Sequence, residues 1–454
     1  MKKRFIALLL VAMASAGLIS GCTSSKGKNS NGENEGGKKE VTVITVNDAA
    51  KLFHKDIIPE FEKEHKDIKV TLIETPFDQF DTKIQTMLAS NTPLDTATHN
   101  GWTGFGSRLA NDQLLPLNDL MEKNNFTTEQ VNIPEEAAKV WQVNGETYAI
   151  PVHIFPTVLL YNKAMFDEAG IPYPPTSFED STWTFDKMLE YAKILTKNTD
   201  DLAKAQYGLL FNWDAGGREQ LPEYFGYHTF DEATFTENSG FASECYFDSP
   251  EVIDVYQKVA DLVYDDGVSP NNTTTEAMGN SPFFAGKCAM FVAGGWELAG
   301  IPQVDFDVGV AAVPNGGSDT VRSVMWIDPY WIFKNSKEPD ATFEYIMYLL
   351  QDDVQKKIVE YSGLAPANMA AFDTYAQLFP GIEKEGLKEV FDGGVKYGQE
   401  GFSHMMPDAS SLNTLITNEM NPIFNEGKSA AEVMPSVQKS VEEYINTTNE
   451  KYGK

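Results

Sequence analysis

The chain contains few of the residues that bind metals or form disulfides. Its 454 residues include three cysteines and six histidines. Cys22, Cys245 and Cys288 form no Cys-x-x-Cys pair and no Cys/His cluster, so the spacing typical of a metal site is absent. We therefore expect no metal and no other cofactor. Cys288 lies in an apolar run typical of a buried strand, and we expect a free, buried thiol there rather than a disulfide, the alternative for an exported protein.

Positive charge is also scarce. The sequence has 36 lysines and arginines against 66 aspartates and glutamates, which gives a formal net charge of −30. Nucleic acids and anionic lipid headgroups bind basic surfaces, so this balance argues against both as partners. Neutral or cationic ligands are favoured only weakly, because acidic surfaces mostly keep proteins soluble.

Apolar runs that could enter a membrane are confined to the N-terminus. Three basic residues follow Met1, the apolar run Phe5–Val11 comes next, and small residues lead to Cys22. This order is typical of a secretory signal, and the run is too short to span a bilayer core of about 30 Å. The end of the segment resembles the bacterial lipobox, in which the cysteine receives lipid. We predict a signal peptide over residues 1–21, lipidation of Cys22 and an anchor on the extracytoplasmic face of the cell membrane; the alternative is a plain signal peptide with a chance cysteine.

A polar segment separates this signal from the remainder of the chain. Residues Thr23–Glu40 contain no apolar side chain, so we expect residues 22–40 to form a lipidated cysteine and a flexible tether. Ordered structure is predicted to begin at Val41. The remaining length of about 410 residues suggests two or three domains.

Hydrophobic periodicity predicts an α/β fold. Expected strands at 41–46 and 68–73 and a short strand ending at His99 alternate with expected helices at 51–65 and 80–88, which is typical of βαβ units and a mainly parallel sheet. After residue 145, two extended runs at 147–152 and 157–161 are joined by a proline-containing segment, and we interpret them as a strand pair that leaves one domain and enters another. Helices at 185–195 and 252–263, an extended crossing at 306–314, a strand at 324–333 and further helices follow.

Several segments together resemble the extracellular solute-binding proteins of bacterial ABC importers, in the carbohydrate-binding family that includes maltose-binding protein. The strongest is Phe284–Trp296, with its Phe-x-x-Gly-Lys-x-Ala-Met run and a closing Gly-Gly-Trp turn. Weaker matches, in the order of the family, lie at 83–94, 148–151, 160–171, 182–186 and 363–366.

The resemblance implies a two-lobed α/β fold, each lobe a mainly parallel sheet flanked by helices, joined by hinge strands. We predict one lobe from residues 41–152 plus 306–361 and the other from 153–305 plus 362–454. The ligand would lie between the lobes and shift the population towards a closed form that a membrane permease reads. The resemblance thus implies a monomeric binding protein without enzymatic activity, with a sugar or oligosaccharide and ABC permease subunits as partners.

A sugar site needs aromatic rings for the flat C–H faces and polar side chains for the hydroxyls. Aromatic residues make up 12% of the chain, and seven are tryptophan. We sought aromatic and polar residues at strand ends, at the hinge and in tight turns, where α/β sheets meet ligands. The predicted ligand-binding residues are Asn47, Asp48, His99, Asn100, Trp102, His153, Trp213, Asp214, Gly295, Trp296, Glu297, Trp326, Asp328 and Tyr361.

Each candidate has a structural alternative. Asn47 and Asp48 could simply cap the following helix, and the two histidines could be structural. We assign Trp141, Trp183 and Trp331 to core packing.

Rival functions remain open at the level of the sequence. A secreted glycoside hydrolase would also be acidic and aromatic-rich, and it would need two catalytic carboxylates, but no segment resembles a hydrolase signature. A receptor for another solute, such as a metal ion or siderophore, is disfavoured by the few histidines. A surface adhesin or sensory protein could use the same cleft to signal.

Overall fold

The computed structural model describes residues 37–98, 104–197, 204–211, 218–279, 281–321 and 323–454. Lys38–Lys454 form one compact unit, and the description below concerns that unit alone. The predicted signal peptide and Cys22 lie outside the described residues. Within the described residues, no helix combines the length and apolar character needed to cross a membrane.

The first half of the sheet contains three parallel strands, β1 (Lys39–Val46), β2 (Ile68–Thr75) and β3 (Thr96–Thr98). Helix α1 (His54–Glu64) packs on β2, while α2 (Phe80–Ala89) and α12 (Pro339–Leu349) pack on β1. The six residues Val41–Val46 are all buried, as expected for a parallel strand covered on both faces. These elements confirm the predicted βαβ pattern. The predicted start of ordered structure at Val41 is wrong by two residues, because Lys39 and Glu40 already pair with Ile68 and Lys69 on β2.

The second half contains β7 (Tyr207–Phe211) parallel to β8 (Cys288–Gly294), and β9 (Val308–Ala311). Helix α7 (Phe185–Leu195) packs on β7 and β8, and helices α10 (Pro250–Tyr264), α17 (Ala409–Glu426) and α18 (Ala430–Tyr452) pack on one another. Cys288 is buried and free, which confirms the prediction made for it.

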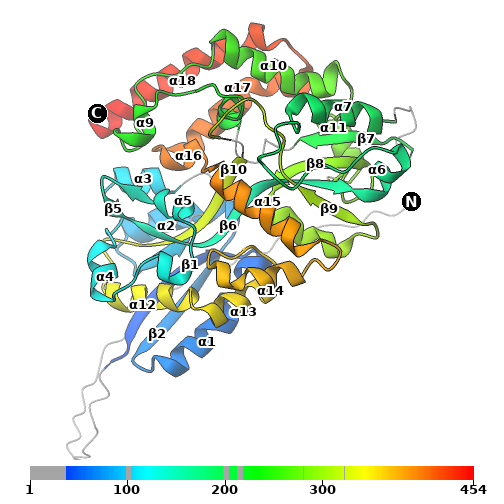
Figure 1. The fold of residues 1–454 in the computed structure, drawn as a ribbon. Coiled ribbons are helices and arrows are strands. Elements are labelled where there is room, and N and C mark those ends of the chain that lie inside the picture. Colours follow the sequence, from blue (N-terminus) through cyan, green and yellow to red (C-terminus); the bar gives the residue numbers. More distant parts are fainter. Residues whose placement is uncertain (1–36, 99–103, 198–203, 212–217, 280, 322) are drawn as a thin grey trace, which may run out of the picture. The chain divides into compact units, whose positions relative to one another are not determined.

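Two long antiparallel strands, β6 (Ala149–Asn162) and β10 (Ser323–Ile332), cross between the two halves (Figure 1). β6 pairs with β10 over its first part and with β8 and β9 over its second, while the end of β10 pairs with β3. The prediction of two separate runs is therefore wrong: they form one continuous strand. The strand accommodates Pro151 because this residue faces Pro329 next to a shift of register, where the ladder of hydrogen bonds is already interrupted.

The pairing of β9 bears on the predicted lobe boundaries. β9 pairs with Leu159–Asn162, so residues 308–311 lie beside the second half of the sheet. This arrangement favours a return to the first lobe along β10 rather than at residue 306, the boundary that we predicted. The lobe boundaries otherwise stay a prediction.

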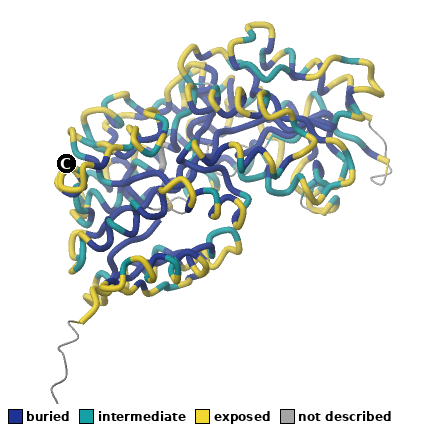
Figure 2. Tube along the Cα trace, turned by 60° about the horizontal axis from the view of Figure 1, so that its bottom comes forward, coloured by how far each residue is buried: buried dark blue, intermediate teal, exposed yellow. Residues whose placement is uncertain are grey.

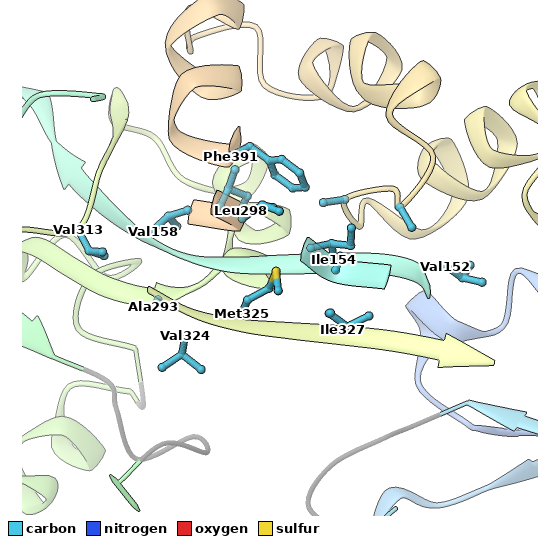
Figure 3. Close-up of a cluster of buried hydrophobic side chains, with 14 of the residues drawn as sticks. Val152, Ile154, Val158, Ala293, Leu298, Val313, Val324, Met325, Ile327 and Phe391 are labelled. Carbon is cyan, nitrogen blue, oxygen red and sulfur yellow. The ribbon is translucent and has the colours of Figure 1, made fainter. Parts of the chain in front are cut away.

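The core is centred on the crossing of β6 and β10. Figure 2 shows buried strands with partly exposed helices around them. At the crossing, Ile154 faces Ile327 across the ladder, and Leu298 and Phe391 lie on the same side of β6 as Ile154 (Figure 3). Trp141, Trp183 and Trp331 are buried as predicted.

Local signals explain how two of the helices begin. Thr184 caps α7, because its hydroxyl oxygen accepts a hydrogen bond from the Lys187 N–H at 3.2 Å. Ser249 precedes Pro250 at the start of α10, but its hydroxyl donates to the Tyr246 carbonyl and makes no cap bond.

The remaining elements are short apart from α13 and α15. They are η1 (Ala49–Lys51), η2 (Phe77–Gln79), α3 (Phe105–Ala110), α4 (Asn118–Lys123), η3 (Glu129–Val131), α5 (Glu135–Lys139), β4 (Gln142–Val143), β5 (Glu146–Thr147), α6 (Lys163–Ala169), η4 (Arg218–Gln220), α8 (Leu221–Tyr224), α9 (Ala233–Thr236), α11 (Asn272–Ala277), η5 (Gly295–Gln303), α13 (Asp352–Ser362), η6 (Met369–Ala371), α14 (Phe372–Gln377), α15 (Lys384–Lys396), β11 (Gly398–Gln399) and α16 (Phe402–Met405).

Candidate functional site

One face of the β6–β10 ladder carries polar and aromatic side chains. Phe155 lies opposite Trp326, and His153 lies opposite Asp328. Directly opposed side chains of antiparallel strands share a face, and alternate residues along a strand share it too. The four residues therefore form a single surface, which we call the cross-strand face. The intervening pair, Ile154 and Ile327, points to the other side and into the core.

Two tryptophans make an aromatic corner at the edge of this face. The rings of Trp296, from the start of η5, and Trp326 are 4.7 Å apart between centroids and inclined by 72°. The Phe155 ring meets Trp296 edge-on at 6.1 Å. Trp296 and Trp326 are only partly buried, so each retains ring surface against which a ligand can stack.

The glycines before Trp296 make this corner possible. A Cβ atom on Gly294 would lie 2.3 Å from the Trp296 ring, and one on Gly295 would lie 3.0 Å from the Pro156 carbonyl oxygen. Gly295, one of the predicted site residues, therefore contributes by allowing close packing of the backbone, while Trp296 supplies the ring.

An ion pair lies at the base of the site. The Lys51 ammonium, from η1, contacts the Asp328 carboxylate and lies 5.5 Å from the centre of the Phe155 ring. The two charged side chains are only 14% and 13% exposed. Burial lowers the pKa of Lys51 to about 7, and the charge of the nearby Asp48 carboxylate opposes this shift. The pair thus places two opposite charges beside the aromatic corner.

His153 presents an unused hydrogen-bonding atom. Its side chain is 1% exposed, its Nδ1 lies 3.6 Å from Asp328 Oδ2, and its Nε2 has no hydrogen-bond partner in the described structure. Burial, assisted by Lys51 and His54, lowers the pKa of His153 well below its usual value. The ring is therefore neutral at physiological pH. Buried polar atoms are rarely left unpaired, so His153 Nε2 remains available for one further hydrogen bond.

A second buried histidine, His54, connects the elements that carry the site. His54 Nδ1 lies 2.6 Å from the Tyr345 hydroxyl and Nε2 lies 2.5 Å from the Tyr330 hydroxyl. A neutral imidazole can donate from one nitrogen and accept at the other, so both contacts can be hydrogen bonds. Burial lowers the pKa of His54 to about 3. The histidine thus ties α1 to β10 and α12 in its uncharged form.

We expect these two histidines to make the protein acid-labile. The unfolded chain binds protons at a histidine pKa of about 6.5, and the folded chain binds them only at much lower pH. Their contribution to stability is thus complete above about pH 6.5 and is lost as pH falls towards 3. His54 should lower the free energy of unfolding by about 1.4 kcal/mol per pH unit across pH 6 to 4, and His153 should act in the same direction. Urea denaturation at several pH values measures this slope.

His54→Asn is the matched variant for the pH experiment. It should unfold more easily at pH 7.5, because two tyrosine hydroxyls lose their partner, but its slope between pH 6 and 4 should be shallower by about 1.4 kcal/mol per unit. An unchanged slope would show that His54 is not the source of the acid sensitivity.

Glu297 connects the aromatic corner to a cavity in the second half of the sheet. Trp296 Nε1 donates a hydrogen bond to Glu297 Oε1 at 3.2 Å. Burial raises the pKa of Glu297, and this hydrogen bond opposes the rise. The carboxylate also borders a cavity of about 370 Å³ whose lining includes Phe211, Arg218, Asn271 and Phe284. Cavities of this size and mixed polarity hold small organic ligands.

The structure places the other described candidates at the margins. Asp48 caps η1 by accepting from the Ala50 N–H at 2.9 Å, which confirms the capping alternative for this residue. Asn47 directly follows β1 and is exposed, and Tyr361, near the end of α13, is 46% exposed. Ligand roles for these three stay predictions, although α13 contacts η1, the element that carries Lys51.

Five candidates lie outside the described residues: His99, Asn100, Trp102, Trp213 and Asp214. The strands that precede them are described. β3 ends at Thr98, opposite Tyr330 on β10, and β7 ends at Phe211, beside Val292 on β8. Both strand ends thus adjoin strands that lead into the cross-strand face or the aromatic corner.

Sequence reasoning missed two residues of the site, Lys51 and Phe155. Phe155 alternates with His153 in an extended run, and this period of two could have revealed it. Lys51 carries no comparable signal, because its partner Asp328 lies 277 positions away. Within the described residues, no group of three or more His, Cys, Asp or Glu side chains is arranged to hold a metal ion.

Comparisons with known proteins agree with this architecture. The maltodextrin-binding protein MdxE of Bacillus subtilis (strain 168) is 26% identical over 378 residues, 81% of this chain and 82% of the relative. Among solved structures, the ABC substrate-binding protein Lmo0181 from Listeria monocytogenes, in complex with cycloalternan, has a TM-score of 0.72 at 20% identity and covers 90% of this chain and 99% of its own. A cyclo/maltodextrin-binding protein complexed with maltotetraose has a TM-score of 0.68 at 19% identity, with 91% and 99% covered.

The similarity to these structures establishes the two-lobed α/β fold. The model of the bacterial extracellular solute-binding protein family matches residues 46–356, which is more than half of the chain. The chain belongs to the bacterial extracellular solute-binding protein family.

Proposed function

We propose that this protein is the substrate-binding component of an ABC importer and captures a neutral sugar or oligosaccharide between its lobes. The observation that carries the proposal is the aromatic corner of Trp296 and Trp326, next to the polar atoms of His153 and Asp328. Rings that stand at an angle can contact two different C–H faces of a sugar, and the polar atoms can bind its hydroxyls. A maltodextrin-binding relative and a similar structure complexed with maltotetraose support the same ligand class, whereas other relatives are named sn-glycerol-3-phosphate-binding proteins.

The position of the site suggests how capture is signalled. β6 and β10 run through both halves of the sheet, and the cross-strand face lies on these strands. A ligand stacked on Trp296 would touch the second half, and one bound to Asp328 or to Asn47 and Asp48 would touch the first. Such contacts exist together only when the halves are close, so binding would favour the closed form that a permease recognises.

The protein acts by binding and not by catalysis in this proposal. The family relatives are binding proteins. A glycoside hydrolase would need one carboxylic acid and one free carboxylate across the bond to be cut. Asp328 is instead held by Lys51, and the Glu297 carboxyl accepts the Trp296 N–H. Incubation with oligosaccharides and chromatography of the products should show no cleavage; catalytic release of sugar would favour the hydrolase.

In this proposal, the N-terminus determines where the protein is held in the cell. Lipid on Cys22 would hold the protein at the extracytoplasmic face of the membrane, close to its permease. Because β1 begins at Lys39, the polar tether is limited to Thr23–Lys38, 16 residues, and a flexible chain of that length has a root-mean-square reach of roughly 20–24 Å. Mass spectrometry of the mature protein should find a diacylglyceryl or acylated cysteine as the first residue.

A thermal-shift screen followed by calorimetry tests the ligand class. The purified protein is heated with maltotetraose, other neutral oligosaccharides, monosaccharides and, for comparison, anionic sugars. A ligand that binds only the folded state raises the melting temperature by mass action. We expect a shift with neutral oligosaccharides. A shift with anionic solutes alone would contradict the proposed ligand class.

A further inference from the structure

A second contact between the two halves lies away from the β6–β10 crossing. Helix α3 belongs to the first half and packs against α16. A Cβ atom on Gly106 would lie 2.3 Å from the Met405 carbonyl oxygen and 2.6 Å from the Met406 carbonyl carbon. Only glycine permits this approach of helix to backbone. Next to it, the Ser107 hydroxyl oxygen accepts a hydrogen bond from the Asp408 N–H at 2.8 Å.

Each side of this contact is fixed to its own half. On the α3 side, buried Arg108 donates to Asp81 on α2 at 2.7 Å, and the Phe105 ring packs edge-on against Trp141 at 5.2 Å. Leu115, which follows α3, donates its N–H to the Ile332 carbonyl of β10 at 2.9 Å. Movement of α3 would therefore require movement of the first half.

The 405–408 segment is held by the C-terminal helix α18. The Tyr444 hydroxyl donates to the Pro407 carbonyl, and the Lys451 ammonium lies 2.6 Å from Asp408 Oδ2. Asn111, directly after α3, also reaches α18 by donating to the Tyr452 hydroxyl at 3.2 Å. Each of the two surfaces that meet here is therefore bonded to larger elements of its own half.

We propose that Gly106 and Ser107, together with residues 405–408, form a clasp that stabilises the closed protein and so sets ligand affinity without touching ligand. This inference rests on the proposed function, because it assumes that closure retains a bound solute. A bulky residue at 106 cannot be accommodated by a side-chain rotation, since the opposing atoms are backbone. The halves must separate instead, and the population of the closed form falls.

The decisive variant is Gly106→Val, with Gly381→Val as its matched control. A Cβ on Gly381 would meet nothing within 4 Å, so the same substitution is harmless there. With maltotetraose as the probe, Gly106→Val should raise the dissociation constant at least about tenfold. The rise should lie mainly in the dissociation rate, because the clasp holds the liganded protein closed. Ser107→Ala, which removes one hydrogen bond, should raise it about fivefold.

Two readouts keep a failure of the clasp distinct from a failure of the sugar assignment. Small-angle X-ray scattering without any sugar should give a larger radius of gyration for Gly106→Val than for wild type or Gly381→Val. If wild type does not bind maltotetraose, the sugar assignment is in doubt but the scattering result still tests the clasp. The clasp is ruled out if Gly106→Val and Ser107→Ala both have the wild-type radius of gyration and, where the probe binds, the wild-type dissociation rate.

Discussion

Trp296→Ala should weaken sugar binding by about 30- to 1,000-fold. The substitution removes a half-buried indole ring from the aromatic corner, where it meets Trp326 at 4.7 Å and Phe155 at 6.1 Å. Losing the burial of a large aromatic against the sugar together with its stacking geometry costs roughly 2–4 kcal/mol. It also deprives Glu297 of its indole hydrogen bond. Isothermal titration calorimetry with the sugar that gives the largest thermal shift measures the loss.

Two variants bracket this prediction. Trp296→Phe keeps a ring in the corner and should lose far less affinity than Trp296→Ala. Tyr227→Ala removes a 41% exposed aromatic that is not part of the corner and should bind like wild type. Wild-type affinity in Trp296→Ala, with an unchanged melting temperature, would remove the aromatic corner from the binding site.

Trp296 could be identified from the sequence because the motif that contains it is local. Gly294, Gly295 and Trp296 are consecutive, and the structure explains the motif by close packing of the ring on Gly294. Strands and helices of the first half were predictable for a similar reason. Their apolar residues recur at short spacing, as in Val41–Val46 and Phe80–Met87, and this local pattern determines which face is buried.

Features that depend on distant pairing could not be predicted in the same way. The proline-containing segment at 151–156 indicated a break, yet β6 is continuous because β10, more than 160 residues later, supplies a partner strand with a matching irregularity at Pro329. The pairing of β9 with Leu159–Asn162, which favours a lobe boundary after residue 306, likewise joins segments about 150 positions apart.

The capping of η1 by Asp48 shows a different limit of prediction from sequence. A residue at a strand end can serve the backbone and a ligand at once, and sequence reasoning had to leave both roles open. The carboxylate of Asp48 accepts from Ala50 through Oδ1. Its second oxygen leaves a ligand role compatible with the cap, so binding measurements on Asp48→Asn decide between one role and two.

The contact between Lys51 and Asp328 is created only by the fold. Removing either side chain should destabilise the protein strongly. Asp328→Ala leaves an ammonium group at the base of the site, 14% exposed and without its carboxylate. Removing one partner of a buried ion pair typically costs about 3–5 kcal/mol, because the remaining group must either keep an uncompensated charge or become neutral at a cost in free energy. Lys51→Met should cost a similar amount. Urea denaturation at pH 7.5 gives both values.

The double variant Lys51→Met with Asp328→Ala measures how strongly the two charges stabilise each other. With both charges gone, no buried charge is left unpaired, so the loss should be clearly smaller than the sum of the two single losses, by about 0.5–3 kcal/mol. Lys139→Met with Glu135→Ala is the matched exposed pair, whose side chains are 62% and 73% exposed, and its coupling should be below about 1 kcal/mol. Strict additivity at Lys51 and Asp328 would mean that the two charges do not stabilise each other. In that case Asp328 would be available to a ligand, and the base of the site would carry a free carboxylate beside the aromatic corner.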